Sequence, residues 1–253
     1  MSKSKIQWTE MTWNPVTGCT KISEGCAHCY AETMTKRLQG MGQHKYSNGF
    51  KVTLHPEALS EPSRIIKPHK FFVCSMADLF HKDVPFDFID SIMEVIELTP
   101  WHTYQILTKR PERMVEYFIG RAKRLHRLFD LPDNVWAGVT VESEREIPRI
   151  SVLRRLLTHS NNIKFISCEP LLGDLGMLNL AAIDLVIVGG ESGPQARPMQ
   201  KQWVLNIMRQ CEEQNVAFFF KQWGTWGEDG VKRNKKANGC TINGKIYQTI
   251  VTP

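Results

Sequence analysis

Three cysteines on one short stretch constrain this chain more than any other feature of its sequence. Cys19, Cys26 and Cys29 lie within eleven residues, in the run WNPVTGCTKISEGCAHCYAE of residues 13–32. Three thiolates on one loop can hold a soft metal ion or an iron–sulfur cluster. With no fourth cysteine nearby, a cluster held here would keep one iron open for another ligand. The spacing alone leaves iron–sulfur, zinc and unrelated core cysteines all open, because both metal sites favour thiolates.

Composition and charge place the chain in a broad class. Its 253 residues, 42% of them hydrophobic, suit one α/β domain with a buried core. Seven cysteines, an odd number, argue for a reducing compartment. The start Met1–Lys5 lacks an apolar signal core and no apolar run reaches the length of a membrane span, so we expect a cytoplasmic protein without a membrane partner. A net charge of +6 permits an anionic partner, although solvated helix faces also explain basic residues.

From residue 70 onward, short apolar runs alternate with amphipathic stretches, which is typical of parallel strands joined by helices. The predicted strands are Phe71–Cys74, Thr103–Leu107, Val135–Val141, Lys164–Ser167, Leu185–Val188 and Ala217–Phe220. The predicted helices are Ala31–Leu38, Phe86–Leu98, Glu112–Leu128, Ile147–Leu157 and Gln202–Glu213. Six strands, with a possible further one before Cys19, fit a partial (β/α)6-type TIM barrel better than a closed eight-stranded barrel. A doubly wound sheet would show the same local pattern.

The predicted barrel takes up residues 1–227 and includes the cysteine loop at 14–32. Residues 228–253 form a C-terminal basic loop and hairpin of the same domain. The hairpin is predicted from Asn243-Gly244, which favours a two-residue turn. The stretch 40–70 is too long for a plain connection, so we expect a functional loop or a short element there.

Polar residues follow almost every predicted strand. In parallel α/β folds, ligands bind at the carboxyl ends of the strands, and packing alone does not require polar groups there. The sequence therefore predicts a reaction site at this edge. The residues concerned are Ser75, Asp78, Thr108, Lys109, Arg110, Thr140, Glu142, Cys168, Glu169, Gly189, Gly190, Glu191, Ser192, Lys221, Gln222 and Trp223.

Several of these positions have two interpretations. Cys168 is able to donate a hydrogen atom to a substrate radical, although a lone cysteine of this kind is more often a small buried hydrophobe. Glu169 and Glu191 are candidates for proton transfer or substrate binding. Gly189-Gly190 allows a close backbone approach to a ligand or forms only a tight turn. Likewise, the run Lys221-Gln222-Trp223 suits a flat, anionic substrate such as a nucleotide, or its tryptophan plugs the barrel end.

The cysteine loop resembles the cluster loop of radical S-adenosylmethionine (SAM) enzymes. The resemblance is strongest to the branch containing spore photoproduct lyase. It rests on Asn14-Pro15, Gly18-Cys19, Gly25-Cys26 and Cys29-Tyr30-Ala31. Six residues separate the first two cysteines where three are usual, and His28 stands where an aromatic residue commonly packs on the adenine. The whole chain also resembles an uncharacterised family of phage and bacterial three-cysteine-motif proteins. The matching stretches are Ser75–Phe80, Leu107–Pro111, Ser167–Gly173, Val188–Gly193 and Phe219–Gly224.

This resemblance implies a radical SAM-like partial barrel with a [4Fe–4S] cluster on Cys19, Cys26 and Cys29. It implies that SAM binds the open iron and is cleaved on reduction to methionine and a 5′-deoxyadenosyl radical. The radical would modify or repair a nucleobase in a nucleotide or nucleic acid, as a lyase, isomerase or transferase. An electron donor such as flavodoxin or ferredoxin is the expected partner, and a further partner protein is compatible. The expected location is the cytoplasm of a bacterium or a phage-infected host.

The same resemblance assigns cofactor contacts. Ser75 and Asp78 would lie near the SAM amine, Thr140 or Glu142 at the ribose, and Lys109 or Arg110 at the carboxylate. His28 would face the adenine or be an exposed imidazole, and Tyr30, Gly189 and Gly190 complete the expected cofactor set. The alternative function is a zinc- or cluster-containing nucleic acid-binding protein without radical chemistry, with His28 or a remote histidine as a fourth zinc ligand. A third possible function is an enzyme that uses the cluster for electron transfer alone.

Overall fold

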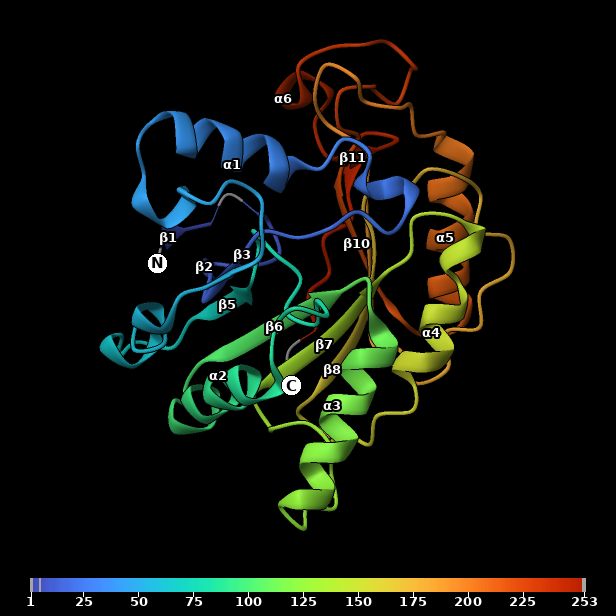
Figure 1. Ribbon diagram of the computed structural model, residues 1–253. Coiled ribbons are helices and arrows are strands. Elements are labelled where there is room, and N and C mark those ends of the chain that lie inside the picture. The colour runs from blue at the N-terminus through green and yellow to red at the C-terminus, as the bar shows by residue number, and fades with distance from the viewer. Residues whose placement is uncertain (1, 5, 252–253) are drawn as a thin grey trace. The chain divides into compact units, whose positions relative to one another are not determined.

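The computed structural model describes residues 2–4 and 6–251 of the chain. Its main sheet has the strand order β1-β2-β5-β6-β7-β8-β9-β10 (Figure 1). The seven strands β2 and β5 to β10 are parallel and form an α/β half-barrel, and β1 pairs with β2 in the antiparallel direction. The predicted partial barrel is therefore confirmed, and β2 is the further strand expected before Cys19.

The strands and helices have the following bounds. The main-sheet strands are β1 (Ser2–Lys3), β2 (Met11–Trp13), β5 (Lys70–Val73), β6 (Thr103–Thr108), β7 (Val135–Thr140), β8 (Ile163–Cys168), β9 (Leu185–Gly189) and β10 (Ala217–Gln222). The helices are α1 (Tyr30–Gly40), α2 (Phe86–Leu98), α3 (Pro111–Arg124), α4 (Pro148–Leu153), α5 (Lys201–Glu213) and α6 (Lys235–Asn238). Two small antiparallel pairs join β3 (Val16–Thr17) to β4 (Thr53–Leu54) and β11 (Thr241–Ile242) to β12 (Lys245–Ile246).

Two helices end earlier than the sequence predicts. α3 ends at Arg124 rather than Leu128, because His126 adopts a left-handed φ of 52°. The N–H of Arg127 then donates to the carbonyl of Ala122 at 2.9 Å, which closes a Schellman-type cap. α4 covers only Pro148–Leu153 of the predicted 147–157. The 40–70 stretch carries β4 and three short 3-10 turns, so the expected short elements are present.

The chain divides into two compact units, which are described in turn. The first comprises Met1–Ile22, Cys29–Ala137 and Arg155–Asn162. The second comprises Ser23–His28, Gly138–Arg154 and Ile163–Pro253. The boundary predicted between residues 227 and 228 stays a prediction. None of the helices in the described ranges has the length and apolar character that a bilayer crossing requires.

Aromatic side chains from three strands form the core of the first unit. Phe71 of β5 stacks on Tyr104 of β6 with ring centroids 5.5 Å apart, and Trp13 of β2 lies 5.7 Å from Tyr104. All three side chains are fully buried. Helix α2 adds the apolar stripe that its sequence period predicts. The buried residues of that stripe are Ile89, Ile92, Met93 and Ile96.

A buried guanidinium joins α2 to α3, which lie beside β6 (Figure 1). Arg121 donates to Glu97 Oε1 at 2.8 Å and to Oε2 at 3.0 Å, and Arg127 pairs with the same carboxylate. Burial acts to raise the pKa of Glu97, but the hydrogen bonds from Arg121 and Arg127 outweigh burial. The pKa of Glu97 therefore lies below its ordinary value of 4.5.

This pair predicts a pH dependence of stability. Because the pKa of Glu97 is lower in the folded chain than in the unfolded chain, its stabilisation is present above pH 4.5 and is lost as the pH falls through the folded value. Glu97→Gln is expected to lower the free energy of unfolding at pH 7 by about 1–3 kcal/mol and to flatten this acid loss. Glu94→Gln, exposed on the same helix, is the control. Urea unfolding between pH 3 and 7 measures both, and equal acid slopes for the two variants would contradict the assignment.

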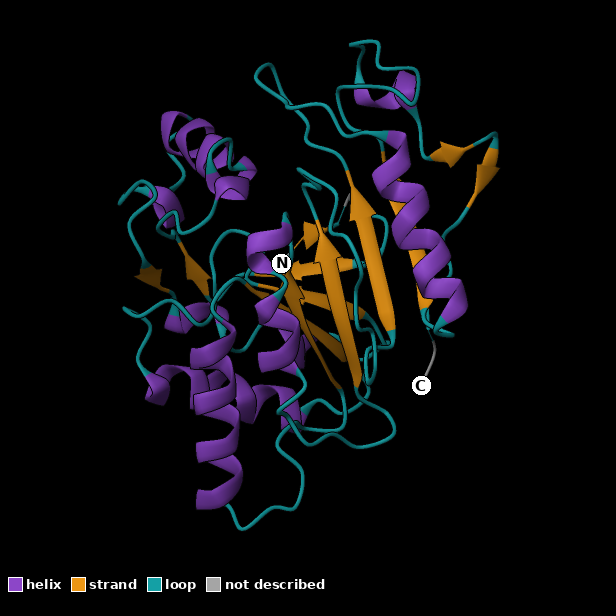
Figure 2. Cartoon of the chain, turned by 90° about the vertical axis from the view of Figure 1, so that its right-hand side faces the viewer, coloured by secondary structure: helices purple, strands orange, loops and turns teal. Residues whose placement is uncertain are grey.

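The second unit is built on parallel strands buried on both faces. Every residue of β8 and β9 is buried, as expected for a parallel sheet covered on both sides. β9 pairs with β8 and β10, and α5 packs along β10. In Figure 2, α5 is the long helix on the right, lying over these strands. At the end of the unit, Asn243 and Gly244 have φ of 50° and 74°, which confirms the predicted hairpin.

Candidate functional site

Cys19 lies at the carboxyl ends of neighbouring strands of the first unit. The preceding Gly18 forms a β-bridge with Ala77, which follows β5. Asn14, directly after β2, accepts hydrogen bonds from the Ser75 hydroxyl and from the next backbone N–H, both at 3.1 Å. The Asn14 side chain thus ties the start of the cysteine loop to the end of β5.

Only glycine fits immediately before Cys19. Gly18 has a φ of 83°, and a Cβ there would lie 2.1 Å from the carbonyl oxygen of Lys51. The Cys19 N–H donates to the carbonyl of Phe50 at 3.2 Å. Gly18 therefore allows the backbone of residues 50–51 to pack closely against the loop, where it fixes the position of Cys19.

Cys29 stands at the N-cap of α1 and is half-buried. It packs against a small apolar cluster that contains Ala31, Tyr46 and Met76. Tyr30, an expected cofactor contact, is 57% exposed, and its hydroxyl lies 3.5 Å from the sulfur of Met76.

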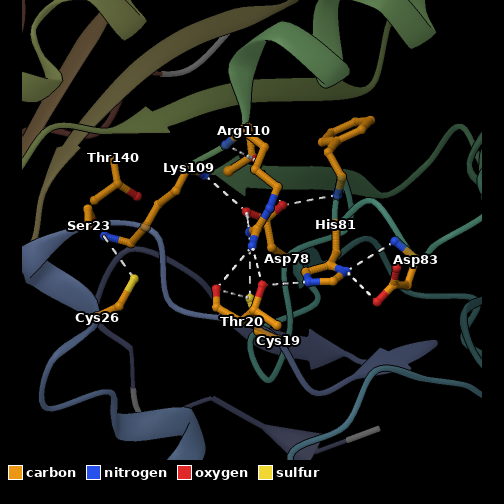
Figure 3. A network of polar contacts seen from close by, with 12 residues as sticks. Cys19, Thr20, Ser23, Cys26, Asp78, His81, Asp83, Lys109, Arg110 and Thr140 are labelled. Atoms are coloured by element: carbon orange, nitrogen blue, oxygen red, sulfur yellow. Dashed lines mark hydrogen bonds and ion pairs between the residues drawn. The ribbon is translucent and has the colours of Figure 1, made fainter.

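The expected cofactor residues Asp78 and Arg110 pair with each other. Arg110 Nη1 donates to Asp78 Oδ2 at 2.8 Å. Asp78, itself buried, also accepts from the Thr108 hydroxyl at 2.7 Å and from the Lys109 N–H at 3.1 Å. Figure 3 shows Lys109 and Arg110 beside the Asp78 carboxylate.

The Arg110 guanidinium also reaches the cysteine loop. Nη1 donates to Cys19 Sγ at 3.6 Å, and Nη2 donates to the carbonyl of Thr20 at 3.0 Å (Figure 3). Burial and the Asp78 carboxylate raise the pKa of Cys19, while Arg110 opposes that rise. Burial prevails, so the pKa of the half-buried Cys19 thiol lies above its ordinary value although a fixed cation contacts the sulfur.

A pocket of about 670 Å³ opens beside Cys19 in the first unit. This volume lies in the range of small-molecule sites. Its lining combines basic, acidic, amide and aromatic side chains. The lining residues are Cys19, Thr20, Lys21, Glu32, Asn48, Phe50, Lys51, Val52 and Asp83.

In the second unit, the segment that carries Cys26 rests on a buried carboxylate. Glu142, which follows β7 and is fully buried, accepts from the Ser23 hydroxyl at 2.6 Å and from Arg149 Nη1 at 2.8 Å. A Cβ at Gly25 would lie 2.5 Å from Glu142 Oε1. The 3-10 turn Glu24–Cys26 therefore needs a glycine where it meets this side chain. The Ser23 hydroxyl lies 3.6 Å from Cys26 Sγ.

A second buried carboxylate contacts the same segment. Glu191, after β9, accepts from Arg197 Nε at 2.9 Å and Nη2 at 2.7 Å, and it lies 3.3 Å from His28 Nδ1. Arg197 also donates to the carbonyl of Glu24 at 3.1 Å. Burial acts to raise the pKa of Glu191, but the hydrogen bonds from Arg197 outweigh it and lower that pKa overall. Ser23–His28 is thus held by two arginine-paired carboxylates.

A third ion pair lies across the ends of β8 and β10. Lys221 Nζ is 2.8 Å from Glu169 Oε1, and the Ser167 hydroxyl donates to Glu169 Oε2 at 3.2 Å. A Cβ at Gly189 would lie 2.8 Å from Glu169 Oε1, so this glycine makes room for the carboxylate. Gln222 is placed otherwise, since its amide donates to the hydroxyl of Ser192 at 3.2 Å.

Four further predicted site residues are buried in the protein. Cys168 is fully buried, and burial raises the pKa of its thiol well above the ordinary value. Trp223 is 1% exposed and donates its indole N–H to the carbonyl of Thr241 at 2.7 Å, as a tryptophan plug would. A Cβ at Gly190 would lie 1.9 Å from the Trp223 carbonyl oxygen, so this glycine serves the packing of that turn. Thr140 is also buried.

Sequence reasoning missed the side chains that hold the predicted ones. These are Asn14, Thr20, Ser23, Arg149 and Arg197. Arg197 lies in the loop that follows β9, so extending the strand-end rule along each loop would have included it. Arg149 lies on the short helix α4 and carries no such signal.

The seven cysteines differ in burial. All seven fall in the described ranges and none forms a disulfide. Cys19, Cys26, Cys29 and Cys240 are half-buried, whereas Cys74, Cys168 and Cys211 are buried. The three half-buried thiols of the cysteine loop, one of them beside a guanidinium, are a donor set suited to iron–sulfur or zinc. Among the described residues, no three His, Cys, Asp or Glu side chains are arranged as a ready-made metal site.

The fold and the cysteine loop define an α/β half-barrel with a three-cysteine loop after its first parallel strand. The chain belongs to the family described as protein of unknown function (DUF5131), whose model matches residues 3–251. A comparison with curated proteins finds no match.

Solved structures of spore photoproduct lyase are similar in fold. A cysteine-to-alanine variant has a TM-score of 0.50 at 14% identity, with 93% of this chain and 72% of that chain covered. The lyase complexed with dinucleoside spore photoproduct has a TM-score of 0.49 at 12% identity, with 84% of this chain covered. The match spans 63% of the length of that complexed lyase.

Proposed function

We propose that this chain is a radical SAM-type enzyme that binds a [4Fe–4S] cluster on Cys19, Cys26 and Cys29. One observation carries the proposal. Cys19 lies at the carboxyl ends of β2 and β5, fixed by Asn14 and Gly18 and contacted by Arg110 from the end of β6. That edge of a parallel α/β sheet is where ligands bind. The similarity of fold to spore photoproduct lyase is consistent with this assignment.

The chain's own residues would position the cofactors. When bound and reduced by a flavodoxin- or ferredoxin-type donor, the cluster would supply the electron that cleaves SAM to methionine and a 5′-deoxyadenosyl radical. Ser75 lies at the end of β5 and is held by Asn14. Lys109 extends from the end of β6 with its N–H fixed by Asp78. These positions suit the amine and the carboxylate of SAM. Glu169, paired with Lys221, is the candidate to bind substrate or carry a proton.

For the substrate we propose a nucleobase in a nucleotide or nucleic acid. The net charge of +6 favours an anionic ligand. The pocket beside Cys19 presents Lys51, the ring of Phe50 and Lys21, which pairs with Glu32 Oε2 at 3.1 Å. Lysines beside an aromatic ring suit phosphate and a stacked base. Binding of a fluorescent single-stranded oligonucleotide should weaken steeply between 50 and 200 mM salt, as about 10³-fold losses are common for multiple phosphate contacts. Absence of binding at low salt would contradict a nucleic acid substrate.

Anaerobic reconstitution tests the cluster. The wild type is expected to bind about four iron and four sulfide per chain and to turn brown. Cys19→Ser should lose most of this iron, whereas Cys240→Ser, a half-buried cysteine outside the loop, should keep it. Metal analysis and absorption spectra measure the outcome. A colourless protein purified with zinc would contradict the proposal and favour a zinc-containing binding protein.

A further inference from the structure

Arg110 is held by several hydrogen bonds at the end of β6. Its side chain is 14% exposed, and Nη1 donates to Asp78 at 2.8 Å. Asp78 is fixed in turn by the Thr108 hydroxyl at 2.7 Å and the Phe80 N–H at 3.0 Å. The carboxylate therefore sets the orientation of the guanidinium through a chain of short contacts within the first unit.

The remaining N–H groups of the guanidinium fork point to the cysteine loop (Figure 3). Nη1 donates to Cys19 Sγ at 3.6 Å, and Nη2 donates to the carbonyl and hydroxyl oxygens of Thr20 at 3.0 and 3.1 Å. The Thr20 hydroxyl is held from its other side by His81 Nε2 at 2.8 Å. Four of the five N–H groups of an arginine are thereby used, so the fork lacks room to take a carboxylate bidentately.

A cation that donates a hydrogen bond to a ligand sulfur lowers the free energy of the reduced cluster relative to the oxidised cluster. Reduction adds one negative charge, and a guanidinium at the sulfur stabilises the more negative state. Hydrogen bonds to cluster sulfurs are among the features that set the potential of such sites. Arg110 is placed to act in this way through Cys19.

We propose that Arg110, held by Asp78, is a positioning residue that raises the reduction potential of a cluster bound through Cys19. This inference rests on the proposed function. It gives the Asp78–Arg110 pair an electronic role.

Redox titration of the reconstituted protein, followed by EPR of the reduced cluster, tests the inference. At the potential where the wild-type cluster is half reduced, Arg110→Gln is expected to show an about tenfold lower ratio of reduced to oxidised cluster. For a one-electron couple this corresponds to a shift of about 59 mV to lower potential. Arg113→Gln is the matched control, because Arg113 lies in the first turn of α3, next to the N-cap residue Arg110, but contacts the Val84 carbonyl and the Phe86 ring.

Arg110→Lys is a second variant that tests the inference if Arg110→Gln does not fold. It keeps a charge but loses the fork, so its ratio should fall about threefold. An unchanged midpoint in whichever variant loads a cluster would overturn the inference and leave the proposed function standing. A wild-type protein that takes up no iron would overturn both.

Discussion

Replacing Asp78 with alanine is expected to destabilise the protein by about 3–5 kcal/mol. Removing one partner of a buried ion pair leaves the other charge without compensation. Here the change strands Arg110, which is 14% exposed, and removes the acceptor for the Thr108 hydroxyl and the Lys109 N–H. The loss should therefore exceed that of an ordinary surface substitution.

Asp78→Asn distinguishes the contribution of the Asp78 charge to stability from the contribution of its hydrogen bonds. The amide oxygen still accepts from Thr108, so this variant should lose about 1–3 kcal/mol. Urea unfolding at pH 7, monitored by tryptophan fluorescence, gives both free energies. A loss below 1 kcal/mol for Asp78→Ala would show that the pair does not hold the end of β6 as described.

Gly25→Ala is expected to weaken metal binding by about 10–100-fold while leaving the fold intact. The added Cβ would meet the Glu142 carboxylate at 2.5 Å. That carboxylate is fully buried and held by Arg149, so the turn Glu24–Cys26 must move and take Cys26 with it. Losses of this size are typical when groups that orient metal ligands are disturbed.

Gly40→Ala provides the matched control, since a Cβ there meets nothing within 4 Å at the end of α1. Iron and sulfide per chain, measured after reconstitution at limiting iron, should fall only for Gly25→Ala. Circular dichroism of the two variants should coincide. Equal iron contents would mean that the contact with Glu142 does not position Cys26.

The fold was largely predictable because its signals are local. Helix α2 has the predicted bounds, since its apolar stripe repeats at helical spacing and Pro85 precedes it. The hairpin at Asn243-Gly244 follows from two residues that tolerate positive φ. The early end of α3 was missed because His126, which carries no glycine-like signal, closes the helix in the left-handed conformation.

The candidate site was predictable in position but not in pairing. The strand-end rule located Asp78, Glu142 and Glu191, since polar groups are not needed there for packing. The conformation of the loops determines which arginine pairs with each carboxylate. The spacing of residues in the sequence does not predict these partners, which are Arg110, Arg149 and Arg197. The alternation of side chains along a strand also did not predict which of two neighbouring residues is buried and which forms an ion pair. Within the second unit, buried Cys168 directly precedes Glu169, which pairs with Lys221.

The most direct test of the proposed function is formation of 5′-deoxyadenosine. Anaerobically reconstituted protein is mixed with SAM and dithionite, with and without single-stranded DNA, and compared with a variant carrying Cys19→Ala, Cys26→Ala and Cys29→Ala. Product from the wild type alone is the result that radical SAM chemistry on these cysteines predicts. Intact SAM in every mixture, with iron loaded on the wild type, would contradict it.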